Sequence, residues 1–251
     1  MAWFDSIILF FISFVANLFS AFAGGGAGLI QLPALIFLGL SFKIALATHK
    51  IASVFLGIGA TFRNLKEKPL NKKFALLILA TGLPGVILGA NIILNIDNRI
   101  AEIALGLLTI GLGIYSFLKP SLGQKNTETH RNTQGYIVGG FILFLIGILN
   151  GSLTSGTGLF VTLWLIRWFG LDYKTAVAYT LILVGFFWNG SGAITLGLQT
   201  EIAWSWLPAL ILGSLLGGYA GAHLAIKKGN KSIKIIYEII TITVGASLLL
   251  K

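Results

Sequence analysis

The stretch Gly24-Gly25-Gly26-Ala27-Gly28 interrupts a long apolar run near the N-terminus. Residues 3–23, which precede it, are almost entirely hydrophobic, and a run of about 20 such residues is long enough to cross a membrane as a helix. Residues 29–40, which follow it, are also apolar but would extend only about 18 Å as a helix. The stretch therefore predicts a membrane helix that ends at the glycines and a short segment that starts again beyond them. That segment is either tilted, partly re-entrant or completed by the glycine stretch before it.

The composition places the whole chain in a membrane. Of its 251 residues, 56% are hydrophobic and 10% are charged, with a mean hydropathy of +0.90, whereas soluble domains carry about 25% charged residues. The 32 glycines suit closely packed membrane helices, and the lack of cysteine excludes disulfides and thiolate metal sites. The first basic residue is Lys43, which favours a retained first helix over a cleaved signal peptide. The net charge of +10 is spread over short loops and indicates topology, not nucleic-acid binding.

Further apolar runs follow along the chain, and a polar stretch over residues 119–134 divides them into two sets. These runs cover residues 44–62, 74–95, 101–118, 135–150, 159–169, 175–198, 204–226 and 233–250. We therefore expect an all-α polytopic membrane protein with about five helical segments before the polar stretch and five after it.

The second set of segments repeats the first. Gly24–Gly28 aligns with Thr154-Ser155-Gly156-Thr157-Gly158, and the offset of later matches drifts only from 130 to 132. These matches pair Gly39-Leu40 with Gly170-Leu171, Lys43 with Lys174, Ala45 and Ala47 with Ala176 and Ala178, Gly85, Gly89 and Ala90 with Gly217, Gly221 and Ala222, and Asn98-Arg99 with Asn230-Lys231. Glycine-rich apolar segments also align by chance, but the near-constant offset favours a true repeat. We expect residues 1–118 and 135–251 to be two membrane repeats joined by a cytoplasmic linker, residues 119–134.

The basic residues predict that the two repeats are inverted. Residues 63–73, 119–131 and 227–234 carry 12 of the 18 Lys and Arg residues, and such loops mark the cytoplasmic side. The loop of the second repeat that corresponds to residues 63–73 carries only Glu201. Equivalent loops then lie on opposite sides, which requires an odd number of crossings per repeat. We expect a multi-pass protein of the cytoplasmic membrane with inverted repeats, the plan of many secondary transporters.

The two glycine breaks are the strongest candidates for a binding site. Paired interruptions at corresponding positions of two repeats point to a transporter's site, and the helix starts beyond them present free N–H groups and a positive dipole end to an anion. Hydroxyl and amide groups add neutral donors in the second break. The candidate residues here are Gly25, Gly26, Gly28, Asn150, Ser152, Ser155, Gly156, Thr157 and Gly158. Small residues also serve plain helix packing, which is the alternative interpretation.

A second constellation, Thr48-His49-Lys50, lies within the apolar run over residues 44–62. An ionisable residue inside a membrane helix is costly and is by default a functional candidate that faces the bundle interior. The matching stretch of the second repeat supplies Thr180, which is polar but uncharged. If the helix starts later in the sequence, the pair instead lies at the membrane surface. Because the unperturbed pKa of histidine lies near physiological pH, His49 is a candidate proton carrier and favours H⁺ over Na⁺ as a coupling ion. Asn189 either lines a polar path or only bridges helices.

These motifs resemble those of a known family. Gly24–Gly28 with Pro33, followed by Ala45-Leu46-Ala47-Thr48-His49-Lys50, is similar to the first signature of TauE/SafE-type sulfite exporters, within the 4-toluene sulfonate uptake permease family. The stretch Gly151–Gly158 is similar to the second signature, and the likeness covers nearly the whole chain. Ala27 stands where many members have glycine, and His49 where relatives often carry a small polar residue or Asn. The resemblance implies transport of sulfite, thiosulfate or small organosulfonates.

We therefore expect a secondary transporter of a small sulfur-containing anion that works by alternating access, with the anion and the lipid bilayer as its partners. The alternatives are a channel or transporter of another small solute, and a non-transporting membrane scaffold. The HExxH, GxSxG and P-loop motifs are missing, so we expect no enzyme activity, cofactor or metal site. The sequence leaves open the choice of anion, the direction of transport and whether the protein forms a homodimer.

Overall fold

The chain folds into a bundle of helices, as predicted. The computed structural model describes residues 3–67, 70–93, 98–153 and 156–250, and these contain no β-strand. The elements are α1 (Trp3–Ala23), α2 (Gly28–Phe37), α3 (Phe42–Asn64), α4 (Lys72–Ile92), α5 (Asn98–Phe117), α6 (Thr133–Ser152), α7 (Thr157–Phe169), α8 (Tyr173–Tyr179), the π-helix η2 (Thr180–Trp188), α9 (Asn189–Gly197) and α10 (Leu207–Leu250). Most of their ends lie within three residues of the ends of the apolar runs, because hydropathy alone defines a membrane helix well.

α2 and α7 are separate helices too short to cross a membrane. Six helical spans of the described chain are long and apolar enough to do so, with α8, η2 and α9 counted as one continuous span, and α10 is the longest of them. α2 and α7 have 10 and 13 residues, which rise about 15 and 20 Å against a hydrocarbon core of about 30 Å. Both begin directly after a glycine break. The predicted short segment after each break is therefore present.

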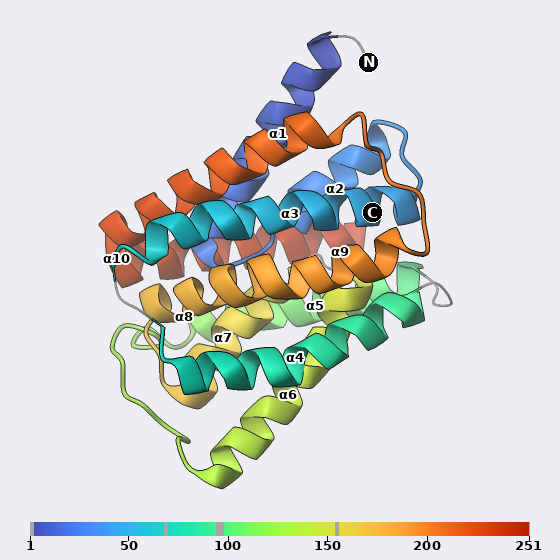
Figure 1. The fold of residues 1–251 in the computed structure, drawn as a ribbon. Coiled ribbons are helices and arrows are strands. Elements are labelled where there is room, and N and C mark those ends of the chain that lie inside the picture. Colours follow the sequence, from blue (N-terminus) through green and yellow to red (C-terminus); the bar gives the residue numbers. More distant parts are fainter. Residues whose placement is uncertain (1–2, 68–69, 94–97, 154–155, 251) are drawn as a thin grey trace.

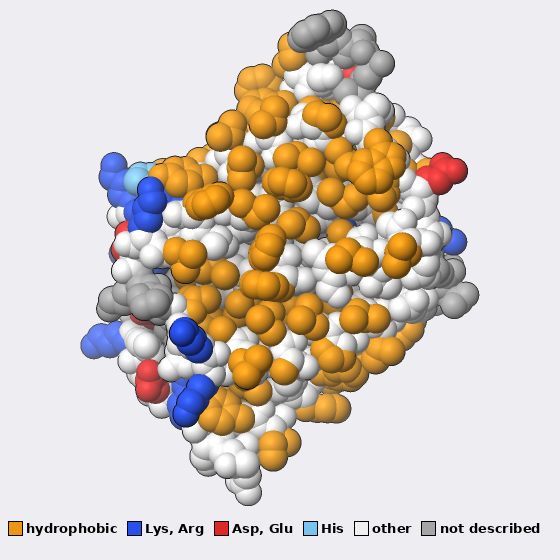
Figure 2. Space-filling model, viewed as in Figure 1, with side chains coloured by type: hydrophobic (Ala, Val, Ile, Leu, Met, Phe, Trp, Pro, Cys, Tyr) orange, Lys and Arg blue, Asp and Glu red, His pale blue; other side chains and the backbone are white. Residues whose placement is uncertain are grey.

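The bundle has one end rich in basic residues. Gly229, with φ 78° and ψ 179°, divides α10 into two arms, and the chain turns back there. This turn lies at the same end of the molecule as the α3–α4 and α5–α6 connections, whereas the α2–α3 and α9–α10 connections lie at the other end (Figure 1). We call the first of these the basic end. Lys and Arg side chains gather along that edge of the surface, and hydrophobic side chains cover the middle (Figure 2).

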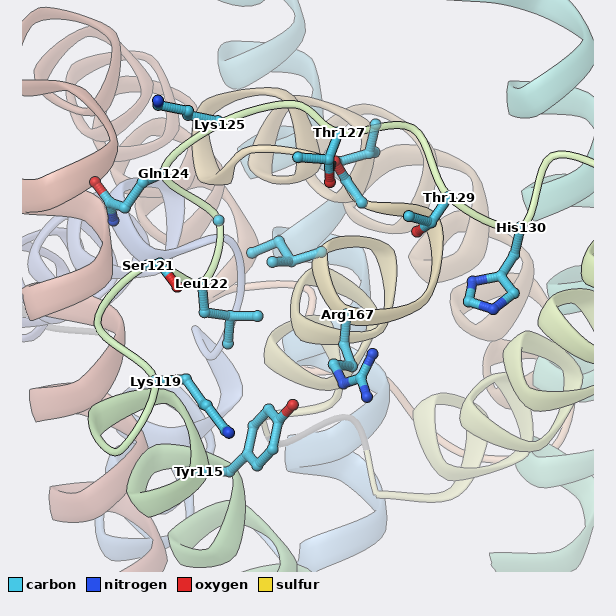
Figure 3. A pocket seen from close by; sticks show the side chains of 14 residues that line it. Tyr115, Lys119, Ser121, Leu122, Gln124, Lys125, Thr127, Thr129, His130 and Arg167 are labelled. Carbon is cyan, nitrogen blue, oxygen red and sulfur yellow. Dashed lines mark hydrogen bonds between the residues drawn. The ribbon is translucent and has the colours of Figure 1, made fainter.

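The linker between α5 and α6, residues 118–132, covers the end of α7. The backbone N–H groups of Thr127 and Thr129 donate hydrogen bonds to the carbonyls of Gly170 and Phe169, at 2.8 and 3.1 Å. Beneath the linker lies a pocket of about 620 Å³ (Figure 3). Side chains of the linker, Tyr115 of α5 and Arg167 of α7 line this pocket. It contains none of the residues that the sequence predicts for a binding site.

Glycines bring two pairs of helices into close contact. A Cβ at Gly217 or Gly221 of α10 would overlap carbonyl oxygens of α1, and a Cβ at Gly85 or Gly89 of α4 would overlap carbonyl oxygens of α6. Small residues four positions apart allow membrane helices to approach this closely. The positions that align between the two predicted repeats therefore have the same packing role. Each helix pair joins one helix from before the linker to one from after it.

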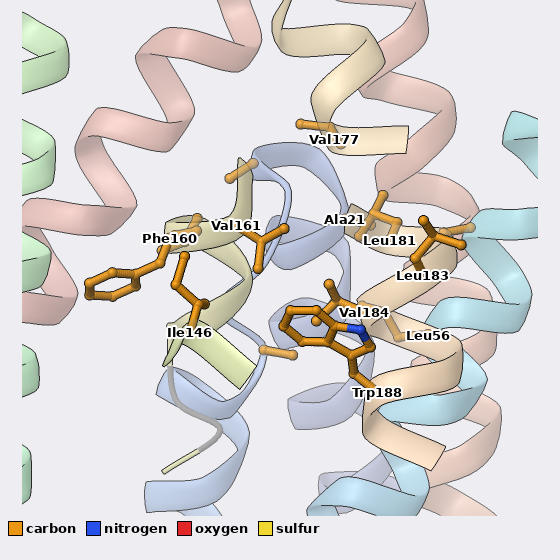
Figure 4. Packing of buried hydrophobic residues seen from close by; sticks show 14 of the residues in the cluster. Ala21, Leu56, Ile146, Phe160, Val161, Val177, Leu181, Leu183, Val184 and Trp188 are labelled. Carbon is orange, nitrogen blue, oxygen red and sulfur yellow. The ribbon is translucent and has the colours of Figure 1, made fainter. Parts of the chain in front are cut away.

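A buried tryptophan fills the centre of the bundle. Trp188 is fully buried beside Leu56 and Val184 (Figure 4), and Gly82 of α4 provides the space for its indole ring, because a Cβ there would overlap the ring. Trp188 ends η2, a nine-residue π-helix. The apolar run over residues 175–198, predicted as one helix, is thus divided into α8, η2 and α9. π-Helical segments are rare and are frequently found at functional sites.

Candidate functional site

The two glycine breaks, far apart in sequence, meet inside the bundle. Gly24, Gly25 and Gly26 all have positive φ, at 88°, 141° and 104°, so the chain can turn from α1 into α2. A Cβ at Gly25 would lie 2.6 Å from the backbone carbons of Gly158. The hydroxyl of Thr162 donates a hydrogen bond of 2.8 Å to the carbonyl of Gly24. The start of α2 therefore lies against the start of α7, backbone to backbone.

A small cavity lies where the breaks meet. Its volume is about 30 Å³, close to the share of one molecule in liquid water. Seven of the predicted site residues are among those that line it, and η2 contributes much of the remaining wall. The lining residues are Ser20, Gly25, Gly26, Ala27, Gly28, His49, Ser53, Leu56, Asn150, Gly158, Thr180, Leu181, Val184, Gly185 and Asn189. Backbone, hydroxyl, amide and imidazole groups thus converge on one point.

Lys50 lies beside this cavity with its charge fully buried. α3 begins eight residues earlier, at Phe42, and none of the Lys50 side chain is exposed, so this ammonium does not lie at the membrane surface. Its Nζ donates to the carbonyl and the Oδ1 of Asn150, at 2.7 and 2.9 Å, and lies 3.5 Å from Oδ1 of Asn189. No carboxylate of the described chain forms an ion pair with it. Within the described chain, every group that holds the ammonium is a neutral oxygen.

Asn150 connects this ammonium to the second break. While its oxygens accept from Lys50, its Nδ2 donates a hydrogen bond of 2.9 Å to Oγ1 of Thr157, the first residue of α7. Gly156, which caps α7 in the left-handed conformation at φ 74°, packs on the side chain of Leu29. The charge on α3 and the start of α7 are therefore one connected unit.

His49 faces the cavity and begins a chain of buried polar groups. Its Nδ1 lies 2.8 Å from Oε1 of Gln31, which can only accept, so Nδ1 carries a proton and Nε2 accepts from Ser53 at 3.1 Å. Nε2 of Gln31 donates to Ser13 at 3.0 Å, and the Ser13 hydroxyl lies 2.9 Å from that of Ser214. Hydrogen-bonded groups thus lead from the cavity into the contact between α1 and α10.

The structure does not bring every predicted residue to the cavity. Thr48 accepts a hydrogen bond of 3.0 Å from the backbone of Ala203, in the loop before α10. The Ser152 hydroxyl donates to the carbonyl of Ile148, one turn back on its own helix, at 2.9 Å. Ser155 lies outside the described residues. Thr48 therefore stabilises the contact of α3 with the loop before α10, and Ser152 stabilises the end of its own helix.

Several cavity residues escaped the sequence reasoning, among them two on α3, and so did one hydrogen-bond partner of His49. Ser53 and Leu56 line the cavity, and Gln31 holds the ring of His49. The only available signal was helical spacing. Ser53 lies four residues beyond His49 and Leu56 lies three residues beyond Ser53, so the three residues share one face of α3. Asn189, for which two interpretations were open, both lines the cavity and approaches Lys50.

Comparison with known proteins identifies the family. The model of the sulfite exporter TauE/SafE family matches residues 9–248. The chain belongs to this family. As a TauE/SafE protein it is similar to curated relatives named "Probable membrane transporter protein".

Three such relatives show how far the likeness extends. The protein from Haemophilus influenzae is 28% identical over 96% of this chain and 93% of its own length, and YfcA from Escherichia coli K12 is 28% identical over 96% and 88%. YunE from Bacillus subtilis is 24% identical over 97% of both chains. No solved structure matches the chain. The TauE/SafE chain described here is thus a multi-pass membrane transporter.

Proposed function

We propose that this transporter carries a small sulfur-containing anion, namely sulfite, thiosulfate or an organosulfonate. The observation that carries the proposal is the buried ammonium of Lys50 beside the cavity, whose partners among the described residues are all neutral oxygens. A buried charge without a counter-ion is costly, and an anion that enters the cavity supplies the missing charge. The family name points to sulfite, and the names of the relatives specify no substrate.

The contacts around Lys50 suggest how the anion is held. The 3.5 Å contact to Asn189 is longer than an ordinary hydrogen bond, so it is the contact that an anion replaces most easily. Asn189 also lines the cavity and can turn its amide N–H groups toward an oxyanion. The starts of α2 and α7 add backbone dipoles whose positive ends favour negative charge. Lys50 then neutralises the anion, and Asn189 and the two helix starts orient it.

Transport requires the walls of the cavity to separate. A space of about 30 Å³ accepts one water-sized molecule, whereas sulfite has four heavy atoms. The proposed cycle opens the cavity alternately toward the basic end, which faces the cytoplasm, and toward the opposite end. Inverted repeats of residues 1–118 and 135–251 fit this cycle. Gly85 and Gly89 pack against α6 in the same way as their counterparts Gly217 and Gly221 pack against α1, which supports the repeat.

We propose coupling to H⁺ as the form of energy input. Nε2 of His49 accepts a hydrogen bond from Ser53, whose hydroxyl can rotate and accept instead when the ring binds a second proton. That proton would lie within the cavity wall, where it adds positive charge for the anion. A pH gradient is therefore expected to change the rate of anion flux.

The decisive experiment compares Lys50→Met with Lys43→Met in proteoliposomes. Methionine keeps the length of the side chain and removes the charge, while Lys43 lies exposed on the same helix and serves as the matched control. Flux of sulfite, thiosulfate and methanesulfonate is measured with and without a pH gradient. Hydrogen bonds to charged groups contribute about 1.5–3 kcal/mol, so we expect binding to weaken about 10–150-fold in Lys50→Met and to stay unchanged in Lys43→Met.

Two outcomes would contradict the proposal. If Lys50→Met carries glycerol or another neutral solute as well as the wild type does, the path is one for neutral solutes and Lys50 has a structural role. If the folded wild type neither binds nor carries any of the three anions, the substrate class is wrong. Folding of each variant is checked by size-exclusion chromatography and thermal melting before transport is measured.

A further inference from the structure

The pocket beneath the linker continues into an apolar groove. The pocket has a volume of about 620 Å³ and the groove one of about 430 Å³, and both are lined by Tyr115 and Arg167. The other residues of the groove are hydrophobic and come from α5, α6 and α7: Leu112, Ile142, Ile146, Phe160, Leu163 and Trp164. A polar compartment at the basic end therefore opens directly into an apolar one within the membrane region.

The pocket is positively charged. Lys119, Lys125 and Arg167 line it, and no acidic residue is among its described lining residues, although Glu128 lies in the same linker. The side chains of Lys119 and Arg167 extend toward Tyr115 from two sides (Figure 3). Arg167 makes no hydrogen bond or ion pair with any part of the chain that the structure describes. Two cations that converge on one phenol form a site suited to a phosphate group.

The groove runs along the direction of a lipid chain. Phe160, Leu163 and Arg167 lie on one face of α7, and the seven helical steps from Phe160 to Arg167 rise about 10 Å. Arg167 is the residue nearest the basic end, so the groove runs from the pocket toward the middle of the membrane. α5 packs mainly against α10, which leaves its side toward α6 and α7 open. An acyl chain fits along this face.

We infer that this site binds an anionic phospholipid, with the phosphate between Lys119 and Arg167 and one acyl chain in the groove. Basic pockets between membrane helices at the cytoplasmic side are typical sites for acidic headgroups. A free phosphate would use the pocket and leave the apolar groove without a role. A helix of a second copy would bring another basic end against these cations, which like charge disfavours. The site is separate from the cavity beside Lys50 and does not depend on the proposed substrate.

The test measures lipid binding by native mass spectrometry and by thermal melting of the purified full-length protein. The probes are phosphatidylglycerol, phosphatidylcholine with the same acyl chains, and inorganic phosphate. We expect phosphatidylglycerol to bind and to raise the melting temperature. Each of the variants Arg167→Gln and Lys119→Gln removes one charge and should weaken the binding of phosphatidylglycerol roughly fivefold. The control is Lys73→Gln, which removes an exposed cation of the basic end outside the pocket and should leave this binding unchanged.

A groove variant tests the second half of the site. Leu112→Trp fills the groove from α5 and leaves the cations in place, so it should weaken binding of phosphatidylglycerol by at least the same factor. Equal binding of phosphatidylcholine, or equal stabilisation by inorganic phosphate alone, would overturn the inference. It would also fail if Leu112→Trp changed the oligomeric state and not lipid binding, because the groove would then hold a second copy.

Discussion

Replacing Gly25 with alanine tests whether the two breaks meet as the structure describes. Gly25 has φ 141°, a conformation that costs other residues about 1–3 kcal/mol, and the added Cβ would lie 2.6 Å from the backbone of Gly158. Backbone atoms cannot move aside as a flexible side chain can. Overlap of this kind costs about 1–3 kcal/mol more. The free energy of unfolding should therefore fall by about 2–6 kcal/mol in total.

Gly39→Ala is the matched control, because Gly39 also has positive φ, 107°, and a Cβ there would meet no atom within 4 Å. It retains the backbone strain without the overlap. For about 1–3 kcal/mol of overlap, Gly25→Ala should melt about 2–12 °C below Gly39→Ala, and it should lose anion binding while Gly39→Ala keeps it. Melting in detergent and a binding assay measure both quantities. Equal melting temperatures with retained binding would show that Gly25 and Gly158 are not in contact.

Two further substitutions probe the core and the basic end. Gly82→Ala places a Cβ into the indole ring of Trp188 and should destabilise the protein by about 1–3 kcal/mol. A lowered melting temperature measures this loss. An unchanged melting temperature would mean that the ring does not lie against α4. A hydrogen bond from Arg63 and a weaker contribution from the hydrogen bond of Lys174 hold the pKa of Glu67 below its ordinary value of 4.5. This group therefore contributes stability above pH 4.5 that is lost as the pH falls through its lowered pKa. Glu67→Gln should reduce the loss of melting temperature between pH 6 and pH 3, and an unchanged pH profile would contradict this.

The helices were predictable because hydropathy determines where a membrane helix can lie. The side chains that face the cavity were less so. Thr48, His49 and Lys50 follow one another at about 100° around α3, so three consecutive residues cannot all face one point. His49 and Lys50 turn toward the cavity region, and Thr48 turns toward the loop at Ala203. A helical wheel through Lys50 would have placed Ser53 near the site and Thr48 away from it.

The π-helix could not be predicted from composition. After Thr180 the segment to Trp188 is apolar, and neither an α-helical nor a π-helical pattern of polar residues marks it. Its form follows from tertiary contacts: Gly185 lies against Gly57 of α3 so closely that a Cβ on Gly57 would overlap the backbone. Such contacts join residues more than 100 positions apart, which no local pattern records. The segment lies in the cavity wall, so the least predictable element is also one of those nearest the site.

The helix pairs restrict how the cavity can open. α1 packs on α10, and α4 packs on α6, so each close pair contains one helix from either side of the linker. Movement of the residues 1–118 as a block against the residues 135–251 would separate both pairs. We therefore predict that each pair moves as a unit and that the cavity opens beside α3 and η2. The lack of native cysteines allows a direct test with one introduced disulfide.

Ser13 of α1 and Ser214 of α10 have hydroxyl oxygens 2.9 Å apart, which places their Cβ atoms near disulfide distance. The double variant Ser13→Cys/Ser214→Cys should form a disulfide and, when oxidised, still carry whichever anion the wild type carries. The same variant in its reduced form is the control for the loss of the two hydroxyls. If oxidation stops transport and a reductant restores it, α1 moves against α10 during the cycle. The moving bodies would then be the two predicted repeats and not the pairs that the glycines hold together.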